Sequence, residues 1–99
     1  MRIAIPHNTT RAKARQIVEK RLKGAEKQYG HMASDFEYEW TNDVLYLRAK
    51  AKGFSVKGTV EITDDEVIID GKLPLLAMPF ESKIRHTVEK EAETIFRKA

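Results

Sequence analysis

The chain has 99 residues, of which 18 are basic and 15 acidic, so its formal net charge is +3. This length predicts a single domain over residues 1–99 with a modest core, and it leaves little material for a deep, enclosed active site. The absence of cysteine excludes disulfides, thiolate nucleophiles and sulfur-ligated metal sites. No stretch approaches the roughly 18 continuous apolar residues of a membrane span. Residues 1–6 are too short for the apolar part of a signal peptide, so we expect a cytoplasmic protein.

The chain opens with a short strand pattern followed by a long helical one. Ile3 and Ile5 share one face of a strand at residues 2–5, and Pro6 ends it, as is typical of a sheet edge. The polar residues 7–10 offer N-caps to a helix at about residues 9–29. Its apolar stripe consists of Ala14, Val18, Leu22, Ala25 and Tyr29, with Ile17 at the margin. The opposite face carries Lys13, Lys20, Lys23 and Lys27.

Residues 36–70 alternate between apolar and polar side chains, with turn clusters at residues 41–43, 52–53 and 63–66. A period of two predicts four strands, each with one buried face and one wet face. Because the connections are short, consecutive strands should pair as an antiparallel meander. The wet face is predicted to carry Glu37, Glu39, Tyr46, Arg48, Lys50, Lys52, Ser55, Lys57, Thr59 and Glu61.

Residues 73–80 form the most apolar segment of the chain. Its two prolines exclude a continuous helix or a central strand, so we expect an irregular, largely sheltered connector. Its side chains either plug the end of the core, which we favour because a small domain needs every large apolar group, or form an exposed patch of Leu75, Leu76 and Met78. A second helix should run from residue 79 or 80 to 98. Its apolar stripe consists of Phe80, Ile84, Val88, Ala92 and Ile95.

The predicted order of elements is β-α-β-β-β-β-α, which indicates an α+β fold. Each helix has one apolar stripe, and the meander has one apolar face. The simplest closure is therefore a two-layer sandwich in which both helices lie on one face of an antiparallel sheet.

Few residues have the spacing of a chemical site. His7, His31 and His86 are far apart and lack metal-ligand spacing, so no metal site is predicted. His7 lies between a strand end and a helix start, where it either makes a local cap or turn contact, which we favour, or meets a ligand. The sequence contains no nucleophile elbow and no glycine-rich phosphate loop. We therefore predict no catalytic residues, no cofactor and no enzymatic activity.

Positive charge is concentrated in the first predicted helix, where residues 9–29 include seven basic side chains and two acidic ones. Together with the basic residues of the sheet, this helix could contact phosphates while Tyr46 stacks on a base. A solvated helix would carry lysines opposite its core stripe in any case, and we favour that interpretation.

Short motifs spread over nearly the whole chain carry a family resemblance. They are an Ile-x-Ile-Pro-His opening at residues 3–7, Ala14-Arg15 in the first helix, Tyr38 and Trp40 before an Asn42-Asp43 turn, Gly58 inside a strand, and the connector at residues 73–80 that leads to Ile84. In these features the chain resembles the polyhydroxyalkanoic acid system protein family, which comprises small bacterial proteins associated with polyhydroxyalkanoate granules.

The resemblance implies a non-enzymatic granule-associated or regulatory protein that acts through surface contacts with the granule surface or with granule proteins. We expect the apolar contact at Leu75, Leu76 and Met78, and we expect charge to come from Lys13, Lys20, Lys23 and Lys27. The alternatives are a nucleic-acid-binding module that uses the basic helix at residues 9–29, and a small hydrophobic-ligand binder between sheet and helices. Edge strands also permit a homodimer.

Overall fold

The computed structural model describes residues 1–29, 34–51, 54–72 and 75–97. The elements follow the predicted order, with one 3-10 helix added before the last helix. They are β1 (Arg2–Pro6), α1 (Arg11–Tyr29), β2 (Ser34–Thr41), β3 (Val44–Ala51), β4 (Phe54–Ile62), β5 (Glu66–Lys72), η1 (Leu75–Phe80) and α2 (Glu81–Arg97).

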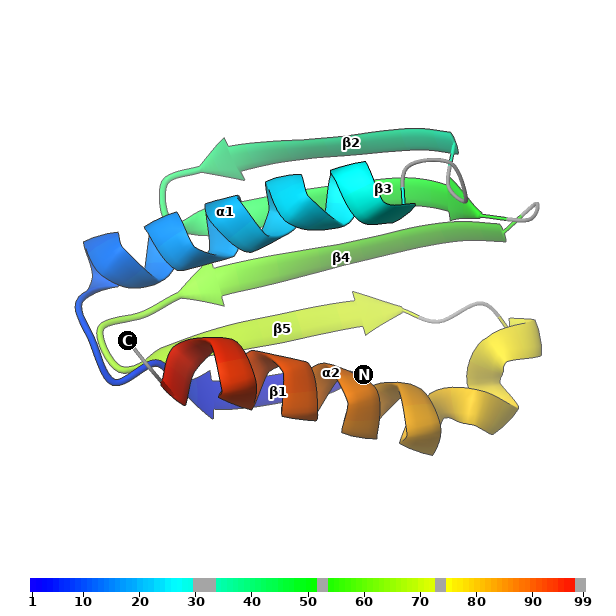
Figure 1. The fold of residues 1–99 in the computed structure, drawn as a ribbon. Coiled ribbons are helices and arrows are strands. Elements are labelled where there is room, and N and C mark those ends of the chain that lie inside the picture. The colour runs from blue at the N-terminus through cyan, green and yellow to red at the C-terminus, as the bar shows by residue number, and fades with distance from the viewer. Residues whose placement is uncertain (30–33, 52–53, 73–74, 98–99) are drawn as a thin grey trace.

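The five strands form one antiparallel sheet in the order β1-β5-β4-β3-β2, so that β1 and β2 are its edges. Both helices lie on the same face, with α1 over the side of β2, β3 and β4 and α2 over β5 and β1 (Figure 1). The predicted α+β sandwich is therefore confirmed.

The core lies between the two layers, where the apolar stripes of the helices meet the apolar face of the sheet. Its buried side chains are Ile3, Ile5, Ala14, Leu45, Val60, Ile62, Val67, Ala92 and Phe96. Ile17, Val18 and Leu22 of α1 pack against this core while partly exposed. The alternate residues of β3 and β4 face away from the helices, and Tyr46, Arg48, Lys50, Lys57 and Glu61 are exposed there as predicted. Of the predicted wet face, Lys52 lies outside the described residues.

Helix α1 begins two residues later than predicted because Thr10 is its N-cap. The Thr10 Oγ1 accepts a hydrogen bond from the Lys13 N–H at 3.1 Å, and the Thr10 carbonyl oxygen accepts one from the Ala14 N–H at 2.9 Å. The side-chain bond satisfies an amide hydrogen of the first turn that has no partner within the helix, and the carbonyl bond is the first of the regular helical series.

The connector after β5 differs from the prediction in both structure and burial. Residues 75–80 form the 3-10 helix η1, which contains Pro79, and α2 begins only at Glu81. Because a 3-10 helix has three residues per turn, its side chains are out of phase with the α2 stripe. Phe80 and Met78 are 60% and 53% exposed, so these two side chains do not plug the core as expected, and the predicted place of Phe80 in the stripe is wrong. The side chains of Leu75 and Leu76 lie outside the described residues.

Two glycines face each other where β4 and β5 come close together. Gly58 pairs with Gly71, and a Cβ atom at Gly58 would lie 3.0 Å from the backbone oxygen of Asp70. Real Cβ atoms rarely approach a backbone oxygen so closely, and the oxygen belongs to the sheet ladder and cannot swing away. Gly58 is therefore required by the spacing of the two strands.

We expect the substitution Gly58→Ala to lower the free energy of unfolding by about 1–3 kcal/mol, because the added methyl group pushes β4 and β5 apart. Thermal and urea denaturation measure this change. Gly24→Ala is the control, because Gly24 lies in the exposed middle of α1 and the nearest atom to its added Cβ is 3.9 Å away, at the end of the Arg21 side chain. That variant should be more stable by about 0.5–1 kcal/mol. Equal stability of Gly58→Ala and the wild type would contradict the close approach.

Candidate functional site

His7 is fully buried at the junction of β1 and α1. Its Nε2 lies 2.8 Å from the carbonyl oxygen of Thr63, and its Nδ1 accepts a hydrogen bond from the Thr9 N–H at 3.2 Å. These partners assign the neutral tautomer with hydrogen on Nε2. The His7 backbone N–H also donates to the Asp65 carbonyl oxygen at 3.1 Å. The Nε2 contact and the backbone bond join the β1–α1 loop to the β4–β5 turn, while the Nδ1 bond holds the ring within its own loop.

Arg11 makes a second connection at the same end of the molecule. Its Nη1 lies 2.8 Å from Asp43 Oδ2 in the β2–β3 turn, and its Nη2 lies 2.9 Å from Asp64 Oδ1 in the β4–β5 turn. The hydrogen bonds to Asp43 and then to Asp64 raise the pKa of Arg11 above its ordinary value. The first turn of α1 is therefore linked to both the β2–β3 turn and the β4–β5 turn. These groups are solvent-exposed, which keeps the energy of each ion pair small.

The remaining arginines of α1 also contact other elements. The Arg15 guanidinium lies 4.4 Å from the centroid of the Trp40 ring, and Trp40 Nε1 donates to Glu19 Oε2 at 2.7 Å. Arg21 pairs with Glu91 of α2. Sequence reasoning treated the charge of this helix as one basic surface and missed this division of roles. The sequence offered no local signal for these contacts, because Asp43, Trp40 and Glu91 lie far from their arginine partners along the chain.

The predicted basic surface is exposed but does not adjoin the predicted apolar contact. Lys13, Lys20, Lys23 and Lys27 are all exposed on α1. Lys13 is near the start of the helix, whereas η1 lies at the other end of the molecule, where α1 ends (Figure 1). Lys27, in the last turn of α1, is the lysine of this set at the η1 end.

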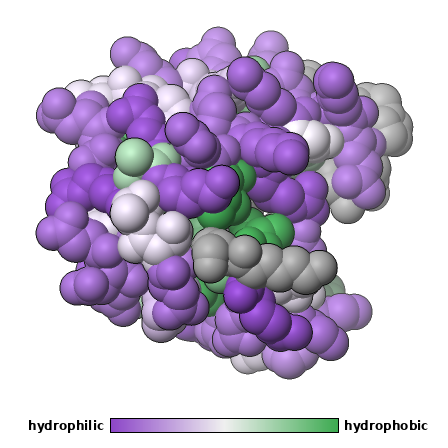
Figure 2. All heavy atoms as spheres, turned by 60° about the vertical axis from the view of Figure 1, so that its left-hand side comes forward, coloured by the Kyte–Doolittle hydropathy of each residue, from purple (hydrophilic) through white to green (hydrophobic). Residues whose placement is uncertain are grey.

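Two apolar side chains of η1 are exposed to solvent, and we call Met78 and Phe80 the η1 patch. Val56, near the start of β4, is 40% exposed at the same end of the sheet (Figure 1). The opposite end of the molecule is mostly hydrophilic, and hydrophobic side chains show there mainly in a hollow near the centre of the view (Figure 2). The η1 patch is therefore on the end of the molecule opposite the β2–β3 and β4–β5 turns.

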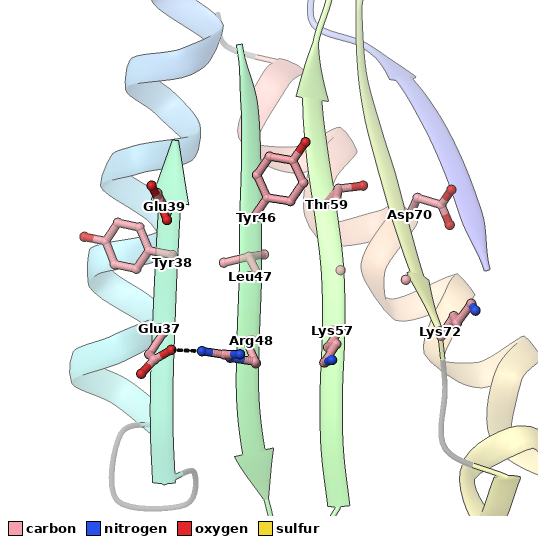
Figure 3. A pocket seen from close by; sticks show the side chains of 12 residues that line it. Glu37, Tyr38, Glu39, Tyr46, Leu47, Arg48, Lys57, Thr59, Asp70 and Lys72 are labelled. Atoms are coloured by element: carbon pink, nitrogen blue, oxygen red, sulfur yellow. Dashed lines mark hydrogen bonds and ion pairs between the residues drawn. The ribbon is translucent and has the colours of Figure 1, made fainter. Parts of the chain in front are cut away.

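The uncovered face of the sheet contains a broad hollow of about 830 Å³, which we call the trough (Figure 3). Two rows of side chains that run across the strands form its walls. The basic row comprises Arg48, Lys57 and Lys72, with Glu37 at its β2 end. The polar row comprises Glu39, Tyr46, Thr59 and Asp70. The backbone between the rows, including Gly58 and Gly71, forms the floor.

Arg48 and Glu37 form an ion pair at one end of the basic row (Figure 3). Their hydrogen bond lowers the pKa of Glu37 and raises the pKa of Arg48. Within the described ranges, Lys57 and Lys72 have no carboxylate at ion-pair distance. The sequence pattern places Arg48 and Lys57 on the wet face, but the inclusion of Lys72 depends on the pairing register of β4 with β5.

The structure gives little support to the other sites considered from the sequence. A second hollow of about 630 Å³ is lined by residues of α1 and by Trp40 of the edge strand β2, whereas the trough lies on the face of the sheet away from the helices. His86 is exposed on α2, and His31 lies outside the described residues. In the part of the chain that the structure describes, no group of three or more His, Asp or Glu side chains is placed to hold a metal ion. None of the described helices is long and apolar enough to cross a membrane.

We expect His7→Ala to lower the free energy of unfolding by about 2–4 kcal/mol, because it leaves a cavity and removes the ring from two hydrogen bonds. Denaturant unfolding measures the change. His86→Ala is the matched control and should shift stability by less than about 0.5 kcal/mol, since His86 is exposed. If both variants unfold at the same denaturant concentration, the His7 ring does not stabilise this junction.

We expect Glu37 to titrate below its ordinary value of 4.5 as long as Arg48 is present. Because folding lowers this pKa, the pair contributes stability above pH 4.5, and the contribution is lost as the pH falls through the lowered pKa. Side-chain carboxyl NMR follows the titration. In Arg48→Met the midpoint should return toward 4.5, whereas Lys90→Met on α2 should leave it unchanged. An unchanged midpoint in Arg48→Met would contradict the ion pair.

The comparisons with known proteins agree with the resemblance seen in the sequence. A search of curated proteins and a search of solved structures find no significant match to the chain. A family model described as polyhydroxyalkanoic acid system protein matches residues 1–96, which is nearly the whole chain. On this match, the chain belongs to the polyhydroxyalkanoic acid system protein family.

Proposed function

We propose that this protein is a non-enzymatic component of polyhydroxyalkanoate metabolism that associates with granules through the η1 patch. The observation that carries the proposal is the exposure of Met78 and Phe80, at 53% and 60%, on one short helix. Membership of the family supplies the polyhydroxyalkanoate context.

The exposure of the η1 patch is costly for a chain of this size. Burying a large apolar side chain is worth about 1.5–3 kcal/mol, and a 99-residue domain has few such groups to leave in water. The apolar surface of a polyester granule, or of a protein that coats it, would bury these side chains. Contact through η1 would therefore add the hydrophobic stabilisation that these two side chains do not contribute to folding.

The ionisable groups with shifted pKa values lie in surface ion pairs. Among the described residues these groups are Arg11, Glu37 and Arg48, and each owes its shift first to a hydrogen bond with an oppositely charged side chain on the surface. Catalytic acids and bases are typically shifted by burial within a cleft. The three shifts are those of ordinary surface ion pairs.

Granule binding through η1 is tested by co-sedimentation of the purified protein with polyhydroxyalkanoate granules. We expect the wild type to sediment with the granules, and we expect Met78→Ser/Phe80→Ser to bind at least about tenfold more weakly, because two apolar contacts are lost. Met78→Leu/Phe80→Leu keeps the apolar surface and should bind as the wild type does.

Recovery of the wild type only in the soluble fraction would overturn granule association. Equal binding by the serine and leucine variants would overturn the role of η1. Lys20→Glu/Lys23→Glu tests the charge of α1 in the same assay. If that variant alone loses binding, and wild-type binding falls steeply with salt, nucleic acid in the preparation becomes the better-supported partner.

A further inference from the structure

The basic row of the trough brings like charges together across the sheet. Arg48 lies directly opposite Lys57, and Lys57 lies directly opposite Lys72, so three cations stand side by side on neighbouring strands. Like charges in such directly opposed positions destabilise a sheet. Glu37 compensates only the Arg48 end of the row. An anion bound along the row would relieve the repulsion at Lys57 and Lys72.

The polar row faces these cations across the trough and offers a different chemistry. Tyr46 is 51% exposed and lies two residues from Arg48 on β3, on the same face of the sheet. Glu39 and Thr59 flank it on the neighbouring strands, and Asp70 lies beyond Thr59 (Figure 3). A two-residue step along a strand separates the rows by about 6.6–6.8 Å, and the basic row spans about 10 Å across three strands.

From this arrangement we propose that the trough binds a mononucleotide. One of its phosphate groups would lie on the basic row, its base would stack on the Tyr46 ring, and its hydroxyl or amino groups would donate to Glu39 and Asp70. Aromatic rings on the open face of an antiparallel sheet are a common platform for stacking bases. The volume of about 830 Å³ also lies within the range of about 300–1,000 Å³ that is typical of small-ligand sites.

The charges beyond the basic row favour a mononucleotide over a nucleic-acid strand. Glu39 and Asp70 flank the trough, and Glu61 follows Thr59 on the same face. These carboxylates would repel the phosphates of a chain that continued past the trough. With Arg48 paired to Glu37, the two remaining cations, Lys57 and Lys72, suffice for one phosphate group. The inference uses a different surface from the η1 patch and does not rest on granule association.

Nucleotide binding is tested by titrating ¹⁵N-labelled protein at low salt with ADP, inorganic phosphate, adenosine and a single-stranded oligonucleotide. We expect ADP to shift the amide signals of β3, β4 and β5 around the trough and to bind more tightly than phosphate or adenosine. Lys57→Glu and Tyr46→Ala should each raise the Kd for ADP about tenfold or more. Lys90→Glu makes the same charge change on α2 and should leave the Kd unchanged.

Three outcomes would overturn the proposal. One is the absence of trough signal shifts at about 10 mM ADP, which corresponds to negligible affinity. Another is binding of inorganic phosphate as tightly as ADP, because stacking of the base on the Tyr46 ring would then contribute nothing to affinity. The third is affinity that grows with oligonucleotide length, which identifies a nucleic-acid strand as the ligand.

The stability of a single variant checks the like-charge repulsion independently of any ligand. We expect Lys57→Gln to raise the Tm of the free protein by about 2–4 °C, because it removes the central charge of the basic row. The same variant should bind ADP more weakly and gain less thermal stabilisation from ADP than the wild type does. An unchanged or lower Tm in the free protein would contradict the repulsion.

Discussion

Both helices pack on one face of the five-stranded sheet, and most other features of the molecule depend on this one-sided burial. The helices bring Ala14, Ala92 and Phe96 onto Ile3, Leu45 and Val60, which leaves the other face of the sheet in water. An antiparallel sheet with one solvated face must alternate apolar and polar residues along each strand. The antiparallel register then decides which polar side chains become neighbours, and in this way it assembles the two rows of the trough from separate strands.

The helix layer is held to the sheet at one end by two kinds of contact with different energies. His7 is buried, so removing its ring would leave buried backbone groups without their partner, at about 1–3 kcal/mol for such a loss. Arg11 reaches two turns, but its ion pairs are exposed and each is worth about 1 kcal/mol or less. His7 therefore contributes most of the stability of the connection between the β1–α1 loop and the β4–β5 turn. Arg11 mainly fixes the position of the two turns relative to α1.

The two layers could be predicted from the sequence because each follows from the spacing of apolar residues along a short stretch of chain. The alternation in residues 36–70 and the helical stripes each specify which side chains are buried. Three features depend on more than a local period. The partner of His7 is 56 residues away in the chain; Lys72 joins Arg48 only through the register of three strands; and the phase of η1 is set by a change from 3.6 to three residues per turn near Pro79. The two proposed binding surfaces were harder to predict than the core because two of these features, the position of Lys72 and the phase of η1, define them.

The η1 patch and the basic row each depart from what stability alone would favour. Exposed apolar side chains do not contribute hydrophobic stabilisation, and opposed cations repel each other. Both features occur in a small domain whose core is modest. Natural proteins tend to keep such local costs at functional positions. The two features occupy different surfaces, one at the end of the sheet where β5 finishes and the other on the face away from the helices. The two surfaces meet where Lys72, the last residue of β5 and of the basic row, is followed three residues later by the start of η1, so a molecule docked through η1 would present the β5 end of the trough beside the docked surface.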